Sequence, residues 1–272
     1  MKRKWEFIGL VVAVLTVTML WLAGRLAEGP AIDGKELSLW LQDYELDRSR
    51  WGPADNAVCK LGTNAIPYLL TLYAGREASW RRWILLVVRS RSLKQAHDVQ
   101  VELRQKEAKF AFHALAAHGI DVAPTLISHY QNTAKNDIRG RLTIISVLGD
   151  LGPSVSVANR FLLNQTESTN DSLRMEAFWA VGQIHTNAEE CVPRLIVGLR
   201  DKNARIRGIA ATDLENFGLE AARAIPELVK MREDEERRAK AWPFALEDRL
   251  AEGNAEAALK TISNAIWLPS VH

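Results

Sequence analysis

The chain has 272 residues, of which 47% are hydrophobic and 25% are charged. This composition excludes a disordered chain, and the length is sufficient to bury a substantial core. The formal net charge is +2, and residues 31–272 contain 31 basic and 31 acidic side chains. Binding to nucleic acid normally requires an excess of basic groups that pair with phosphates, so the composition predicts no nucleic-acid partner.

An apolar stretch over residues 7–24 dominates the N-terminal region. It contains no charged residue, it follows three basic residues at positions 2–4, and Trp5 and Trp21 lie near its ends. Eighteen helical residues span about 27 Å, which is close to the hydrocarbon thickness of a bilayer. We therefore predict a membrane anchor within residues 1–30, with the N-terminus in the cytoplasm and the rest of the chain exported.

A cleaved signal sequence is the alternative interpretation of residues 1–30. Signal peptides have an apolar region of about 7–15 residues and a small-x-small cleavage site. The stretch in this chain is longer, and Leu22 and Pro30 disfavour the two candidate cleavage sites. An uncleaved anchor is favoured, which predicts a single-pass protein of the cell membrane, whereas cleavage would make the protein secreted.

Residues 173–231 contain two copies of one unit at a spacing of 33 residues. Three pairs of positions share this spacing: Arg174 and Arg207, His185 and Gly218, and Pro193 and Pro226. Each copy has the pattern of a helix, a turn and a second helix near a proline, and His185 occupies a turn position that is glycine in the other units. A fixed period in this range is typical of a solenoid of helical hairpins, in which each unit packs against its neighbours.

A pair of apolar residues after the start of each second helix extends this pattern to five units. Aligning these pairs places five residues in register: Pro67, Pro124, Asn159, Pro193 and Pro226. Proline is favoured in the first turn of a helix because the N–H it lacks has no partner there. Successive positions are 57, 35, 34 and 33 residues apart, so the first interval contains an insertion.

The first helices align on the dipeptides Ile138-Arg139, Leu173-Arg174 and Ile206-Arg207, with polar capping residues before them such as Asp137, Ser172 and Asn203. Arginines repeated on successive hairpins are compatible with a ligand site. The favoured interpretation is that they bind carboxylates or carbonyl oxygens of the adjacent repeat and fix the stacking.

The insertion near residues 76–100 is basic and contains Trp80 and Trp83. A helix of this kind can lie on an anionic membrane surface or dock a partner. The favoured alternative is that its apolar residues pack into the solenoid while its arginines are solvated.

The chain thus divides into four parts. Residues 1–30 are the anchor or signal sequence, and residues 31–53 form a capping segment with a predicted helix stripe of Leu37, Trp40, Leu41 and Tyr44. Residues 54–232 contain the repeats, and residues 233–272 form C-terminal capping helices, the last of them over residues 255–267.

The repeat motifs resemble those of HEAT-like repeat proteins, in the short-period form also found in phycobilisome lyases. The resemblance is carried by LGTNAIPYLL at 61–70, VPRLIVGLRDKNARIRGIAA at 192–211 and FGLEAARAIPELVKM at 217–231. With the lead-in GKELSLWLQDY, the chain also resembles membrane-anchored bacterial HEAT-repeat proteins. The resemblance implies an all-α, right-handed solenoid that binds other proteins.

No group of residues has the pattern of a catalytic centre, so we predict a chain that is not an enzyme and uses no metal or cofactor. Cys59 and Cys191 lie 132 residues apart in apolar helical patterns, which favours two core residues over a disulfide. None of the six histidines is followed by glutamate: His97, His113, His118, His129, His185 and His272.

The resemblance implies that the second helix of each hairpin lines the concave side of the solenoid. Its polar and aromatic positions outside the core form the candidate binding surface: Tyr68, Thr125, His129, Arg160, Asn164, Arg194 and Lys230. The alternative is that these side chains are only solvated. We therefore expect a protein-binding scaffold tethered to the membrane, with a lyase-like or other ligand-binding activity as the alternative function.

Overall fold

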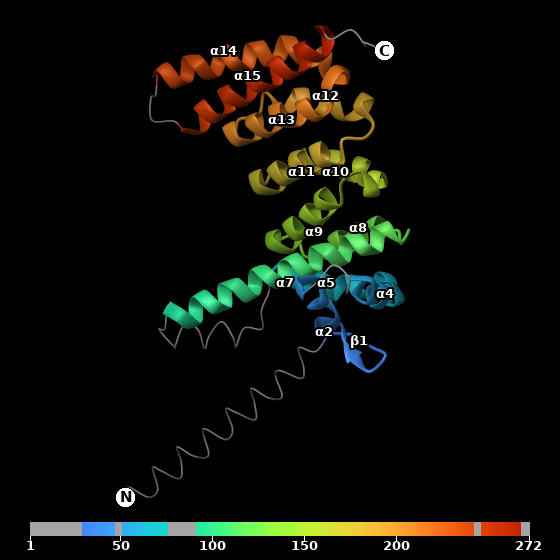
Figure 1. Ribbon diagram of the computed structural model, residues 1–272. Coiled ribbons are helices and arrows are strands. Elements are labelled where there is room, and N and C mark those ends of the chain that lie inside the picture. The colour runs from blue at the N-terminus through green and yellow to red at the C-terminus, as the bar shows by residue number, and fades with distance from the viewer. Residues whose placement is uncertain (1–28, 47–50, 76–90, 242–245, 268–272) are drawn as a thin grey trace, which may run out of the picture. The chain divides into compact units, whose positions relative to one another are not determined.

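The computed structural model describes residues 29–46, 51–75, 91–241 and 246–267 (Figure 1). The chain divides into two compact units, residues 1–111 and residues 112–272. The predicted anchor over residues 7–24 lies outside the described residues, as do residues 76–90 of the basic insertion.

The N-terminal unit begins with a β-hairpin that the sequence analysis did not predict. Strand β1 (Ala31–Ile32) pairs antiparallel with strand β2 (Lys35–Glu36). Asp33 and Gly34 between them have φ angles of 51° and 77°, and an Asp-Gly pair is favoured in hairpin turns because both residues tolerate positive φ. The N-terminal unit is therefore not purely helical.

Helices form most of the remaining described part of the N-terminal unit. Leu37, Leu41 and Tyr44 are buried, which confirms three members of the predicted apolar stripe, while Trp40 is half-buried. Gly62, with a φ angle of 58°, follows the first helix of the first repeat, as predicted. The helices are α2 (Leu37–Leu41), α3 (Asp43–Leu46), α4 (Trp51–Leu61), η2 (Gly62–Ala65), α5 (Ile66–Tyr73) and α7 (Arg91–Ala117), the last of which continues into the C-terminal unit.

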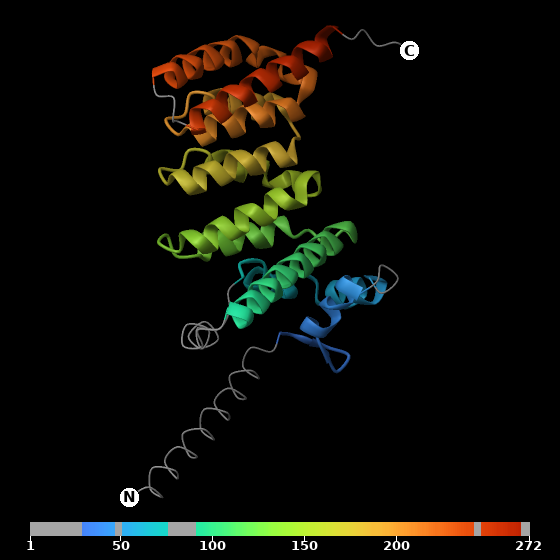
Figure 2. The same ribbon diagram turned by 60° about the vertical axis from the view of Figure 1, so that its left-hand side comes forward.

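The C-terminal unit is an all-α array of helical repeats, as predicted (Figures 1 and 2). Its first helices α9, α11, α13 and α15 pack side by side in that order. The helices after α7 are α8 (Ala123–Asn132), α9 (Ile138–Leu151), η3 (Gly152–Ala158), α10 (Asn159–Gln165), α11 (Asp171–Ile184), α12 (Ala188–Gly198), α13 (Ala204–Asn216), η4 (Gly218–Ala224), α14 (Ile225–Ala241) and α15 (Leu246–Trp267).

The 33-residue period is visible at both ends of the first helices. Asp137, Asn170 and Asn203 cap α9, α11 and α13 by accepting backbone N–H groups with their side chains, so Asn170 takes the place expected of Ser172. At the other end, three residues have left-handed backbone angles: Gly152, His185 and Gly218. His185 therefore ends α11 at the position of glycine in the neighbouring repeats, as predicted.

The alignment of arginines in the first helices was wrong in α9. Arg141, not Arg139, lies four residues after the capping residue, as Arg174 and Arg207 do in their helices. Arg139 is exposed, because the Ile-Arg dipeptide of α9 lies two residues earlier in its helix. The three equivalent arginines each donate to a backbone carbonyl of the preceding loop: Arg141 to Thr133 at 3.0 Å, Arg174 to Ser168 at 2.7 Å and Arg207 to Asp201 at 2.9 Å.

Two of these arginines also bind carboxylates of the next repeat. Arg174 Nε lies 2.7 Å from Asp201 Oδ2, and Arg207 Nε lies 2.5 Å from Glu235 Oε1. The expectation that the repeated arginines bind carboxylates of the adjacent repeat is confirmed for Arg174 and Arg207.

The C-terminal helices differ from the prediction. Helix α14 continues through the charged segment to Ala241, and α15 begins at Leu246 rather than at residue 255. Ala258 and Ile262 are buried as expected, whereas Ile266 is 45% exposed. Helix α15 packs against both α13 and α14, so it takes the place of a further first helix.

Among the described residues, one helical stretch is long and apolar enough to cross a membrane. It covers Ile138–Gln165, and 61% of its most apolar window is buried inside the protein. The stretch comprises α9, η3 and α10 of the repeat array, so its apolar side chains belong to the core of the C-terminal unit.

Candidate functional site

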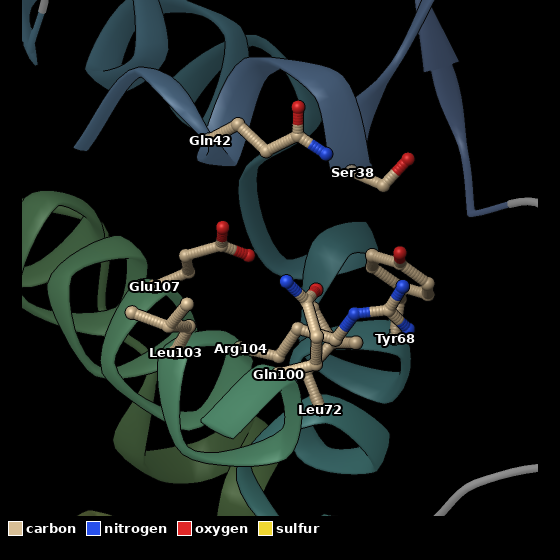
Figure 3. A pocket seen from close by; sticks show the side chains of 8 residues that line it. All are labelled: Ser38, Gln42, Tyr68, Leu72, Gln100, Leu103, Arg104 and Glu107. Atoms are coloured by element: carbon tan, nitrogen blue, oxygen red, sulfur yellow. The ribbon is translucent and has the colours of Figure 1, made fainter. Parts of the chain in front are cut away.

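The N-terminal unit has a polar cavity of about 330 Å³ between α2, α5 and α7. Figure 3 shows the Arg104 guanidinium beside the ring of Tyr68, with Ser38 and Gln42 on the opposite wall. Burial raises the pKa of Tyr68, and the nearby positive charge of Arg104 opposes that shift. Gly29 lies against the same ring, since an added Cβ there would come within 2.5 Å of it.

A second cavity, of about 250 Å³, lies between α13, α14 and the loop after α12. Its lining is mostly charged and includes Lys230. Arg200 Nε donates to Glu227 Oε1 at 2.7 Å, and this contact lowers the pKa of Glu227. The pairs Arg200–Glu227 and Arg207–Glu235 thus connect the loop after α12 and helix α13 to α14.

The largest of the three cavities is a groove of about 640 Å³ across α11, α13 and α15. Met175, Trp179, Ile209 and Leu250 form its apolar walls. Leu250 is 58% exposed, so the apolar surface of the groove reaches the outside of the molecule.

The rim of the groove is polar. Arg205 Nη2 on α13 lies 2.7 Å from Glu247 Oε1 on α15, and both side chains are more than half exposed. Asn254 Nδ2 donates to the carbonyl oxygen of Gly208 at 3.3 Å. The charges of Arg205 and Glu247 thus compensate each other at the entrance.

Asp213 lines the groove from the last turn of α13. Its side chain packs against Gly182 of α11, where an added Cβ would lie 2.0 Å from the Asp213 Cγ. Asp213 is 2% exposed, and its Oδ2 has no hydrogen-bond partner within the described part of the chain. Burial raises the pKa of Asp213 well above its usual range.

The repeat period shows that Asp213 is unusual. The equivalent positions 33 and 66 residues earlier hold Ala180 and Val147, and both of these residues are buried. A carboxyl group thus stands at a core position that is aliphatic in the two preceding repeats.

Comparison with protein families identifies the repeats. The family model of HEAT repeats matches residues 159–247. This part of the chain is similar to HEAT repeats. The groove is lined by the HEAT helices α11 and α13 and by α15, which begins at the end of the matched region.

Comparison with solved structures finds a crystal structure of an engineered protein. Its sequence identity is 15%, the alignment covers 84% of this chain and 97% of that chain, and the TM-score is 0.42. No curated protein matches the chain in sequence.

The seven predicted binding residues are spread over the second helices and do not converge. Tyr68 and Lys230 line two different cavities, and Arg194 is paired with Glu167. None of the three cavities described above contains more than one of the seven. The remaining four lie half-buried or exposed on second helices: Thr125 and His129 on α8, and Arg160 and Asn164 on α10.

The sequence did not predict the groove residues, because the predicted binding surface consisted of polar and aromatic positions on the second helices. The groove lies on the first helices of the HEAT array and on α15, and most of its lining is apolar. One feature of the sequence marked it: Asp213 interrupts the aliphatic column formed by Val147 and Ala180 at the repeat spacing.

Both cysteines are free, and they lie in different units. Burial raises the pKa of Cys191 to about 11, which keeps its thiol protonated at neutral pH and unreactive as a nucleophile. Among the described residues, no three His, Cys, Asp or Glu side chains lie close enough together to hold a metal ion.

Proposed function

We propose that the protein is an interaction scaffold whose HEAT array binds a segment of another protein. The apolar groove across α11, α13 and α15 is the observation that carries the proposal. Arrays of helical repeats bind partners on surfaces built from several successive units. An open apolar groove between helices is also the type of surface that receives an apolar-anchored peptide or helix.

Site-specific photocrosslinking in cells that make the full-length chain tests this proposal. Benzoylphenylalanine replaces Leu250 in the groove, and Val197 on α12 is the matched control because its exposure, 57%, is nearly the same. We expect a crosslinked partner protein from position 250 and none from position 197. Equal crosslinking at both positions, or none at position 250, would contradict the assignment of the groove.

A small-molecule ligand is the second candidate for the groove. Its volume of about 640 Å³ lies within the range of about 300–1,000 Å³ that is usual for ligand pockets. This candidate includes the lyase-like activity that the short-period HEAT resemblance allows. Release of a small molecule on denaturation of the purified chain, without a protein crosslink at Leu250, would favour it.

We also propose that residues 7–24 anchor the protein as a single-pass protein of the cell membrane, with the N-terminus in the cytoplasm and the repeats exported. The support is the uncharged stretch, the basic residues before it, and the positions of Trp5 and Trp21. Deletion of residues 1–30 is expected to move the protein from the membrane fraction to the soluble fraction. A deletion variant that stays with the membrane would contradict the anchor, and a mature chain that begins after residue 24 would indicate a cleaved signal sequence.

A further inference from the structure

The inference drawn here rests on the proposed scaffold function and names the chemistry of the partner. We propose that the groove of α11, α13 and α15 receives a lysine or arginine side chain, flanked by apolar residues, whose cationic group pairs with Asp213.

The unpaired carboxyl group of Asp213 is the first argument. Burial of a carboxyl group without a hydrogen-bond partner opposes folding. The Asp213 Oδ2 is buried and has no partner among the described residues, although Ala180 and Val147 show that the repeat accommodates an aliphatic residue at this position. A destabilising group that lines an open groove is typical of a site that is completed by a ligand.

The charged groups that line the groove indicate the sign of the charge on the ligand. Besides Asp213, the charged groups that line the groove are Arg205 and Glu247, and these two form an ion pair with each other. Asp213 is therefore the one charge-bearing group of this lining without a counterion. A cation completes the site, whereas an anion would meet a second negative charge.

The walls of the groove fit the stem of a long basic side chain. Met175, Trp179 and Ile209 line the groove together with Asp213. The methylene groups of lysine and arginine pack on apolar surface while the charged end binds a polar partner. The indole of Trp179 can also contact the cation through its ring face. A basic residue between apolar neighbours would thus use both the walls and the carboxylate.

The raised pKa of Asp213 predicts that binding releases a proton. Below that pKa the empty site holds a neutral carboxylic acid, and pairing with a cation requires the carboxylate. The affinity for a basic ligand should therefore rise with pH until Asp213 is ionised in the free protein. Asp213 is the group of the groove lining whose pKa is raised, so it produces this dependence.

The test uses the full-length chain and the probe peptides acetyl-Leu-Leu-Lys-Leu-Leu-amide and its glutamine analogue. We expect the lysine peptide to bind about tenfold more tightly, the ratio that corresponds to 1.4 kcal/mol. We also expect this preference to grow as pH rises through the range in which Asp213 ionises and to vanish in Asp213→Asn. Glu176→Gln is the matched control, because Glu176 is a half-buried carboxyl that binds Ser146 outside the groove.

A stability measurement separates loss of the site from misfolding. Asp213→Ala restores the residue of the preceding repeat, so it should raise the melting temperature by about 2–4 °C while it removes the preference for lysine. A variant that melts higher and still prefers the lysine peptide would overturn the inference.

The remaining outcomes distinguish this inference from the scaffold proposal. Equal binding of the two peptides to the wild type, or no binding of the lysine peptide at millimolar concentration, overturns the role of Asp213. If crosslinking at Leu250 persists in that case, the scaffold stands and only the charge recognition fails. If crosslinking is also absent, both proposals fail.

Discussion

The buried ion pair between Arg207 and Glu235 joins α13 to α14. The two side chains are 7% and 0% exposed, and the Glu235 Oε2 has no hydrogen-bond partner among the described residues. Removal of Arg207 leaves the buried Glu235 with the half-exposed Arg238, whose Nη1 lies 2.8 Å from Glu235 Oε1. A buried charge that loses one partner in this way is costly, whereas an exposed pair contributes little. The two arginines of α13, Arg205 and Arg207, therefore differ in importance although they are two residues apart.

Substitution of these arginines tests that difference. Arg207→Ala should lower the free energy of unfolding by about 3–5 kcal/mol, and Arg205→Ala, whose partner Glu247 is half exposed, should lower it by about 1 kcal/mol or less. Chemical denaturation of both variants measures the two values. Equal losses would show that burial does not decide the strength of these pairs.

The sequence predicted the pairing of the repeated arginines but placed one of them wrongly. Arg139 follows Ile138 and Arg141 precedes Leu142, so each arginine has an apolar neighbour. The dipeptide pattern alone therefore did not show which of the two is equivalent to Arg174 and Arg207. The capping residue decides the register, because Asp137, Asn170 and Asn203 each lie four residues before the arginine that is used. A rule based on helix caps would have found Arg141.

The first helices approach one another closely at two glycines. An added Cβ at Gly149 of α9 would lie 2.5 Å from Trp179 Cζ3 and 3.0 Å from the Cα of Ala180, both on α11. Gly182 of α11 lies 33 residues after Gly149, and it contacts Asp213 of α13 in the same way. These glycines therefore set the distance between successive first helices.

Gly149→Ala tests this contact between helices. The added methyl group must displace α11, which should cost about 1–3 kcal/mol of unfolding free energy. Gly253→Ala is the control, because Gly253 lies in α15 with no atom within 4 Å of the added Cβ, and there alanine should stabilise by about 0.5–1 kcal/mol. If thermal unfolding shows that Gly149→Ala is also stabilising, the glycine is not required for packing.

At the scale of elements, local chemistry predicted several helix ends, but the prediction for Pro193 was wrong, because this residue lies inside α12 and not in its first turn. Pro67 and Pro226 lie in the first turns of α5 and α14, and His185 ends α11 with a left-handed backbone. The β-hairpin at Asp33-Gly34 was missed because its strands are only two residues long. The start of α15 was placed nine residues late, because the charged segment before Ala255 was interpreted as solvated helix faces with a break near Pro243.

At the scale of the whole molecule, the 33-residue period predicted the array of helical repeats, since repeats stabilise one another through neighbouring contacts. The groove was not predictable in the same way. Its walls come from Met175, Ile209 and Leu250 on three helices, and their convergence depends on how the first helices stack. The period does align Asp213 with Ala180, so the sequence shows that Asp213 is an exception among the repeats. It does not show which residues surround Asp213 in the folded protein.

Within the described part of the chain, Asp213 is a buried acid whose Oδ2 has no hydrogen-bond partner. Its pKa is raised in the folded chain, so above the pKa of about 3.9 of an unfolded aspartate the unfolded state binds fewer protons than the folded state. Stability then falls as pH rises towards the folded pKa. This contribution is absent from Asp213→Asn, which keeps the shape of the side chain without an ionisable group.

The measurement that tests this claim most directly is the free energy of unfolding of the full-length chain and of Asp213→Asn, compared across pH. We predict that the wild type loses stability relative to the asparagine variant as pH rises above about 4. Parallel profiles, or a wild type that gains stability relative to the variant, would mean that the Asp213 carboxyl is solvated or paired. That result would contradict the account of the groove as a site that awaits a cation.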